Sequence, residues 1–288
     1  MKSAKYQLKD HPWIALILII FTLVLTLAAT SIVLFEILNL NPEDSINQIL
    51  PATIANLLLL FVIIPLFYKL PNGNGKLKHY LEDIGLLKLK PFLKLILIGV
   101  TCYLIFLISQ AAGTIIFRVS QGNPVNMEFI SELFKFSNEF PPKSNGWLIA
   151  LPSTLEEFVF RGVILTMFLN KYSSTKAIVF SAIPFGIMHL LNLAGDRELI
   201  WVLSQVIWST IIGLFYGYLF VKTRSLLPVV LVHYLGNLFI GTITSYFQSN
   251  ASAEIQSIYG IIFFFGLVPT TLSIIWIRFF IKKWSIQL

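Results

Sequence analysis

Long apolar runs separated by short polar segments dominate the pattern of this sequence. A helix of about 20 apolar residues is long enough to cross the roughly 30 Å of hydrocarbon in a bilayer. Eight runs reach about this length, near residues 13–38, 50–68, 92–117, 146–170, 176–194, 199–221, 226–247 and 257–281. The pattern predicts an all-α, polytopic membrane protein with about eight transmembrane helices, in which residues 1–288 form a single integral membrane domain.

The composition agrees with a chain whose main solvent is lipid. Hydrophobic residues make up 56% of the chain and charged residues only 12%, whereas soluble domains carry about 25% charged residues. The net charge of +7 does not indicate nucleic-acid binding, because Lys and Arg are scattered between apolar runs and form no basic helix face. We therefore expect contact with the lipid bilayer and none with nucleic acid.

The distribution of charged residues predicts an orientation in the membrane. Cytoplasmic loops retain Lys and Arg, and most of the 21 Lys and Arg residues fall on the side of the N-terminus, while most acids fall on the other side. An even number of spans places both termini on one side, so we expect both termini to be cytoplasmic. The Ile-, Lys-, Asn- and Phe-rich composition favours a bacterial plasma membrane.

Two connecting segments carry apolar residues of their own. The cytoplasmic one contains an amphipathic stretch from His79 to Leu87, which we expect to lie along the membrane interface. The external one, residues 118–145, places aromatic and aliphatic residues such as Phe129 and Leu133 among acids. This second pattern predicts a short helix along the outer surface.

Ionisable residues within the spans are concentrated in three of them. Each costs at least about 2.5 kcal/mol at a helix centre on insertion scales, so each requires a reason. They are Glu156, Glu157 and Arg161 in the fourth span, His189 in the fifth and His233 in the seventh, and the amide Asn237 lies one turn after His233. These groups must face protein or trapped water rather than lipid. The simplest arrangement is a single shared, water-accessible cavity.

The same residues form an ordered set of motifs. The motifs are Glu-Glu-x-x-x-Arg at Glu156, Glu157 and Arg161, Phe-x-x-x-His at Phe185 and His189, and His-x-x-x-Asn at His233 and Asn237. The set resembles that of the CAAX-protease and bacteriocin-processing (Abi) family, which includes the type II CAAX prenyl endopeptidases. By motif the resemblance covers about residues 146–240. It implies an all-helical fold and hydrolysis of a peptide bond within the bilayer, but it does not identify the substrate.

Helix geometry distinguishes the two adjacent glutamates. Glu157 and Arg161 lie four positions apart on one helix face, which is the spacing of an ion pair, and such buried pairs are commonly architectural. Glu156 points about 100° away from Glu157 at the usual 3.6 residues per turn and lacks an obvious local counter-ion. We therefore interpret Glu157 and Arg161 as groups that orient the fourth span, and Glu156 as the catalytic base.

These residues lead to a hypothesis for an intramembrane endopeptidase. Glu156 takes a proton from a water that His189 helps to hold, and Asn237 and His233 stabilise the oxyanion that forms. The substrate would be a membrane-associated peptide or protein, prenylated or lipid-proximal. A metal variant, with Glu156, His189 and His233 as ligands to a divalent ion such as zinc, stays open because imidazole and carboxylate suit that metal.

The same pattern is compatible with a second function and disfavours a third. A non-catalytic membrane adaptor or bacteriocin-immunity protein could use the same pocket to bind a peptide or the helix of a membrane-protein partner. A transporter is disfavoured because the chain shows no repeated halves. Polar residues elsewhere in the spans, among them Gln110 and Gln205, are interpreted as packing elements, as is Phe185 beneath His189.

Overall fold

The computed structural model describes residues 7–72, 76–134, 150–194, 198–239 and 251–284. Within these ranges every regular element is helical, as predicted, and there is no strand. In chain order the elements are η1 (Leu8–Asp10), α1 (Pro12–Ser31), η2 (Ile32–Ile37), α2 (Ser45–Leu58), η3 (Leu59–Tyr68), α3 (Leu77–Asp83), α4 (Phe92–Ser120), α5 (Met127–Phe134), α7 (Leu151–Glu157), η4 (Phe158–Leu165), α8 (Thr166–Leu169), α9 (Ser174–Met188), η5 (His189–Ala194), α10 (Leu199–Thr223), α11 (Leu227–Phe239), α13 (Ala253–Ile255), η6 (Gln256–Leu267) and α14 (Val268–Trp284). The segments η2, η3, η4 and η6 are π-helical, whereas η1 and η5 are 3₁₀-helical.

Six helical stretches in the described residues are long and apolar enough to cross a membrane. They are Pro12–Ile37, Ile46–Tyr68, Phe92–Ser120, Ser174–Leu193, Leu199–Thr223 and Ile258–Lys282. Each corresponds to one of the eight predicted runs. An integral membrane protein is thereby supported, but the count of eight is not confirmed.

The other two predicted spans are not among these six, each for a different physical reason. The first, predicted at 146–170, contains the continuous helical stretch of α7, η4 and α8, but its three charged residues make it more polar than the other six. The second, predicted at 226–247, contains α11, whose apolar part is shorter than a full span. The remainder of that second prediction lies outside the described residues.

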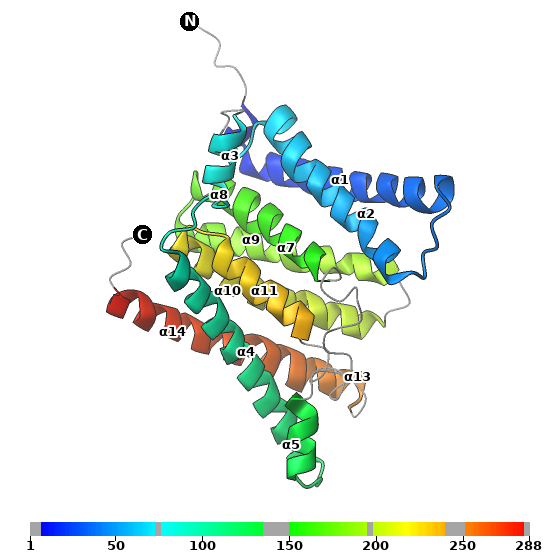
Figure 1. Cartoon of the computed structure of the whole chain (residues 1–288), viewed down its shortest axis with the longest axis vertical. Coiled ribbons are helices and arrows are strands. Elements are labelled where there is room, and N and C mark those ends of the chain that lie inside the picture. Colours follow the sequence, from blue (N-terminus) through cyan, green and yellow to red (C-terminus); the bar gives the residue numbers. More distant parts are fainter. Residues whose placement is uncertain (1–6, 73–75, 135–149, 195–197, 240–250, 285–288) are drawn as a thin grey trace, which may run out of the picture.

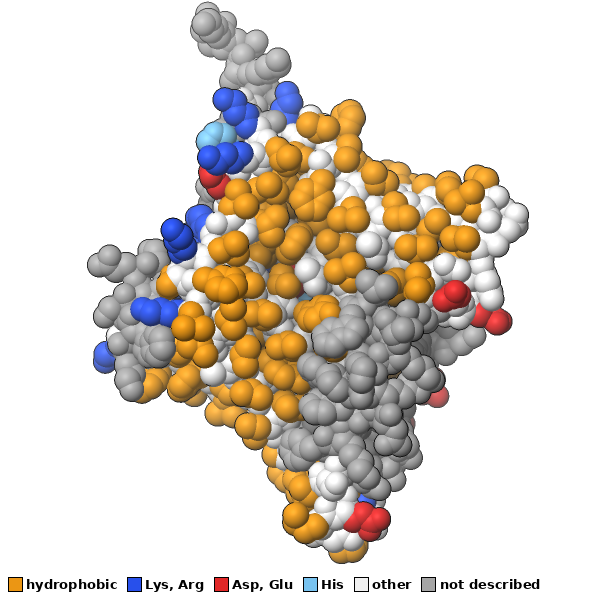
Figure 2. Space-filling model, in the orientation of Figure 1, with side chains coloured by type: hydrophobic (Ala, Val, Ile, Leu, Met, Phe, Trp, Pro, Cys, Tyr) orange, Lys and Arg blue, Asp and Glu red, His pale blue; other side chains and the backbone are white. Residues whose placement is uncertain are grey.

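Many of the helices lie roughly side by side, and α4 crosses in front of α14 in the view of Figure 1. The first helix begins and the last ends on the same side of this array (Figure 1). Hydrophobic side chains cover much of the visible face, while most Lys and Arg side chains gather towards one edge and most Asp and Glu side chains towards the other (Figure 2). The separation of charge expected from the sequence is therefore present in space.

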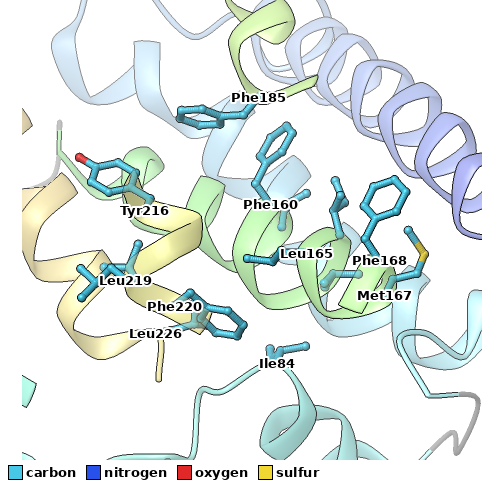
Figure 3. Close-up of a cluster of buried hydrophobic side chains, with 14 of the residues drawn as sticks. Ile84, Phe160, Leu165, Met167, Phe168, Phe185, Tyr216, Leu219, Phe220 and Leu226 are labelled. Atoms are coloured by element: carbon cyan, nitrogen blue, oxygen red, sulfur yellow. The ribbon is translucent and has the colours of Figure 1, made fainter. Parts of the chain in front are cut away.

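The segment with the motif glutamates lies in the centre of the fold. In η4 every side chain from Val159 to Leu165 is buried. Phe160 and the α8 residue Phe168 belong to the same apolar cluster as Phe185 of α9 and Tyr216 of α10 (Figure 3). The catalytic candidates on α7 and η4 are thus held by packing on several sides rather than by one neighbouring helix.

Close packing between α9 and α10 depends on a glycine three residues before His189. A Cβ atom at Gly186 would lie 2.6 Å from the backbone oxygen of Val206 and would also overlap the Thr210 hydroxyl. We expect Gly186→Ala to destabilise the protein by about 1 to 3 kcal/mol, the usual cost of overpacking. The melting temperature in detergent measures this effect, with Gly236→Ala as the control because its Cβ would meet no atom within 4 Å. If Gly186→Ala melts no lower than the control, the close approach is not required.

The two predicted surface segments are partly buried against the protein. In and just after α3, Tyr80 and Ile84 are only 4% and 0% exposed, so this segment does not simply lie along the interface. The predicted external helix is present as α5, but its Phe129 and Leu133 pack in a cluster with Ala111 of α4. Residues 135–145 of that predicted segment lie outside the described residues.

Candidate active site

Glu157 and Arg161 form an ion pair that is completely buried. Glu157 is the last residue of α7, and Arg161 lies in η4, a type of wide helical turn that is frequent at functional sites. Arg161 Nη1 donates a hydrogen bond to Glu157 Oε1 at 3.2 Å, and Nε lies 3.2 Å from Oε2. The second contact is an ion pair without hydrogen-bond alignment, since Nε and Oε2 have no hydrogen-bond partner among the described residues. The pair predicted from the four-residue spacing is present.

Aromatic rings enclose the Arg161 guanidinium. Its Cζ atom lies 4.0 Å from the ring centroid of Phe185 and 5.3 Å from that of Tyr216, both within the range of a cation–π contact. A Cβ at Gly213 would approach Nη2 to 3.2 Å, so the glycine leaves room for the guanidinium. Phe185 also packs edge-on against His189, with ring centroids 5.3 Å apart. Its role therefore includes the predicted packing beneath His189 and a second contact that the sequence did not indicate.

His233 is joined to Glu157 by a hydrogen bond that sequence reasoning missed. Its Nδ1 lies 2.7 Å from Glu157 Oε1, although the two residues are 76 positions apart in the chain. Because the carboxylate accepts, Nδ1 carries the hydrogen in this contact, and Nε2 is the ring nitrogen left for other contacts. Glu157 consequently contacts both Arg161 and His233, so it connects its own helix to α11 in addition to forming the ion pair.

Glu156 lies on a cavity of about 390 Å³. The cavity is lined by Glu156 of α7, His189 at the start of η5, and His233 and Asn237 of α11. These are the four side chains that the sequence predicted to converge. Glu157 and Arg161 are buried beneath this surface and do not line the cavity, so the two adjacent glutamates differ in position as helix geometry predicted.

The backbone fixes the orientation of His189. Its Nδ1 lies 3.0 Å from the carbonyl oxygen of Phe185, one turn earlier in α9. A carbonyl can only accept, so Nδ1 donates, and Nε2 can accept a hydrogen from a molecule in the cavity. This arrangement suits a residue that holds a water rather than one that donates to an oxyanion.

Several other polar residues line the cavity that sequence reasoning did not assign to it. They are Gln110 of α4, Asn192 of η5, and Gln205, Ser209 and Tyr216 of α10. Asn192 Nδ2 donates to Gln205 Oε1 at 2.8 Å, which connects η5 to α10. Gln110 and Gln205 were interpreted as packing residues, because no local spacing relates them to the motif positions.

The described residues contain no group of three or more His, Cys, Asp or Glu side chains placed to hold a metal ion. The candidate ligands Glu156, His189 and His233 line one cavity but do not form such a group. The side chains as placed do not fit a zinc site, so no step below is assigned to a metal.

The fold and the cavity define a helical membrane protein with carboxylate, imidazole and amide groups gathered at one cavity. Residues 146–239, about one third of the chain, match the model of the family described as type II CAAX prenyl endopeptidase Rce1-like. The match confirms the resemblance drawn from the three motifs and supports a CAAX-type intramembrane protease. No curated protein and no solved structure matches the chain.

Proposed function

We propose that this protein is an intramembrane endopeptidase in which Glu156 activates a water for attack on a peptide bond. The observation that carries the proposal is that Glu156, His189, His233 and Asn237, from three separate helical segments, line one cavity. A carboxylate, two imidazoles and an amide supply the base and the hydrogen-bond donors that amide hydrolysis requires. The family match of residues 146–239 supports the same reaction.

We infer the reaction from the chemistry of the groups that line the cavity. The Glu156 carboxylate takes a proton from a water that also donates to His189 Nε2, and the resulting hydroxide oxygen bonds to the peptide carbonyl carbon. Asn237 and His233 donate to the oxyanion of the tetrahedral intermediate. When the C–N bond breaks, the leaving nitrogen receives the proton from the Glu156 carboxyl group, and the products are a carboxylic acid and an amine.

Glu157 gives His233 its role in this scheme. In the neutral imidazole, the Nδ1–H bond to Glu157 leaves Nε2 as an acceptor, so donation to an oxyanion requires the protonated ring. Glu157 Oε1 lies 2.7 Å from His233 Nδ1 and holds the ring in a fixed orientation. We propose that Glu157 orients His233 towards the oxyanion, while Arg161 balances the charge of Glu157.

The substrate class is proposed as a peptide segment of a membrane-associated protein, prenylated or lipid-proximal, because the cavity lies among apolar helices. The test uses purified protein and a panel of membrane peptides with and without a farnesyl group, analysed by mass spectrometry. Cleavage at a defined bond supports the endopeptidase. Binding without cleavage of any peptide would contradict it and favour the adaptor or immunity function.

We also propose that the source is a bacterial plasma membrane and that both termini lie in the cytoplasm, since most Lys and Arg residues fall on that side. A cysteine at position 45, between the first two spans, should react with an impermeant maleimide from outside intact cells. A cysteine at position 222, an exposed position near the end of α10, should react only after permeabilisation. The opposite pattern would reverse the orientation. Cys102 does not interfere because it is buried.

A further inference from the structure

Gln110 is a buried amide in the cavity wall that the proposed chemistry does not use. It lies in the middle of α4, outside the residues that match the family model. Its side chain is 6% exposed and lines the same cavity as Glu156 and His233. Among the described residues its carboxamide has no hydrogen-bond partner, and only its backbone oxygen accepts a bond, from Thr114.

The amide atoms of Gln110 are not among the fully buried atoms that lack a partner, so they open onto the cavity, where a ligand can reach them. Packing alone does not account for a polar side chain here, because a Leu or Met would fill the same position of an apolar helix without any need for a hydrogen-bond partner. Ser209 of α10 is likewise buried at 4% exposure and lines the cavity. The cavity therefore has polar groups besides the four proposed for catalysis.

The chemistry of a carboxamide identifies what it would bind. It offers N–H donors and a C=O acceptor side by side, and a peptide group offers the complementary C=O and N–H. The backbone groups of a helical peptide are already paired within the helix. Only a substrate segment that is extended or unwound has free backbone groups for such a contact.

We propose that Gln110 is a positioning residue that hydrogen-bonds a backbone peptide group of the substrate beside the scissile bond. The substrate is consequently non-helical at the site, and recognition there depends on its backbone rather than on one side chain. This inference rests on the proposed function for the identity of the ligand as a peptide. It adds a binding role for α4, which carries none of the motif residues.

The test compares Gln110→Met with wild type on one peptide that the wild type binds, taken from the panel above. Methionine keeps the unbranched shape of glutamine but removes both hydrogen-bonding groups. The peptide is also made with each backbone nitrogen near the cleavage position methylated in turn, which removes one N–H at a time. Dissociation constants are measured by thermophoresis, and kcat and KM by mass spectrometry. Ser109→Ala is the matched control, because Ser109 is equally buried but faces a different groove, between α4 and α14.

We expect Gln110→Met to weaken binding about tenfold, the effect of one lost hydrogen bond in a buried site, and to raise KM more than it lowers kcat. For one of the N-methylated peptides, methylation should weaken binding to the wild type about tenfold relative to the unmethylated peptide. The same methylation should not weaken binding to Gln110→Met. Ser109→Ala should keep the wild-type affinity and the wild-type sensitivity to methylation.

Two results would overturn the inference. The first is that Gln110→Met binds the peptide with unchanged affinity. The second is that N-methylation weakens binding to Gln110→Met and to the wild type by the same factor at every position. A purely structural role predicts the second result, together with a lower melting temperature. Binding that follows the expected pattern without any cleavage would overturn the proposed protease but leave the Gln110 contact standing. Failure of the wild type to bind any peptide would overturn both.

Discussion

Replacement of Glu156 by glutamine is expected to leave a folded, normally inserted protein whose rate of peptide cleavage falls at least about 10²-fold, the lower range for a lost general base. Glu156 lines the cavity, and glutamine keeps its size while removing its capacity to accept a proton. The melting temperature should change little, because Glu156 is not part of the buried ion pair. Turnover and melting temperature are measured in the same detergent.

The matched control is Glu82→Gln, the same chemical change at a side chain that is 43% exposed and lies beside His79. This control should keep wild-type turnover. Near-normal turnover in Glu156→Gln would remove Glu156 as the base and require another group, with His233 as the next candidate because Glu157 orients it as a carboxylate orients a catalytic histidine.

Glu157→Gln is expected to have the largest effect on stability. It leaves the Arg161 guanidinium, which is 0% exposed, without its counter-ion, and breaking a buried pair in this way costs about 3 to 5 kcal/mol. Turnover should also fall, because His233 loses the charged acceptor at 2.7 Å. Thermal unfolding measures the first effect, and peptide cleavage at a temperature where the variant is folded measures the second.

A double variant separates the two roles of Glu157. Glu157→Gln with Arg161→Met removes both charges, and replacing a whole buried pair is far less costly than removing one partner. We expect the double variant to regain most of the melting temperature but not the turnover, since His233 still lacks its carboxylate. A normal melting temperature in the single variant, or full turnover in the double variant, would show that the ion pair or the His233 contact has been assigned the wrong role.

The sequence predicted what depends on local spacing. Apolar runs of sufficient length identified the six stretches that could span a membrane, and the four-residue separation of Glu157 and Arg161 predicted their contact, because helical neighbours are set by the chain itself. Of the two predicted spans that did not qualify, the one with Glu156, Glu157 and Arg161 is too polar, because these charged residues weaken its hydropathy signal. The other is too short in the described residues, where its apolar helix covers only Leu227–Leu238.

Contacts between distant segments could not be predicted in the same way. The bond between His233 and Glu157 depends on how α11 packs against α7, and no periodicity within either helix encodes that arrangement. Gln110 is a similar case, since its face of α4 becomes a cavity wall only through packing with other helices. The motifs indicated which residues converge, whereas the pairing of charges and the remaining wall required the three-dimensional structure.

The most direct test of the account is cleavage of one membrane peptide in ¹⁸O-labelled water by wild type and Glu156→Gln, each reconstituted in lipid vesicles. Hydrolysis by activated water predicts that the wild type cuts one bond and places a single ¹⁸O atom in the new carboxylate, with the Glu156→Gln product reduced at least about 10²-fold. Absence of cleavage by the wild type, or equal amounts of labelled product from both proteins, would contradict a glutamate-dependent intramembrane protease.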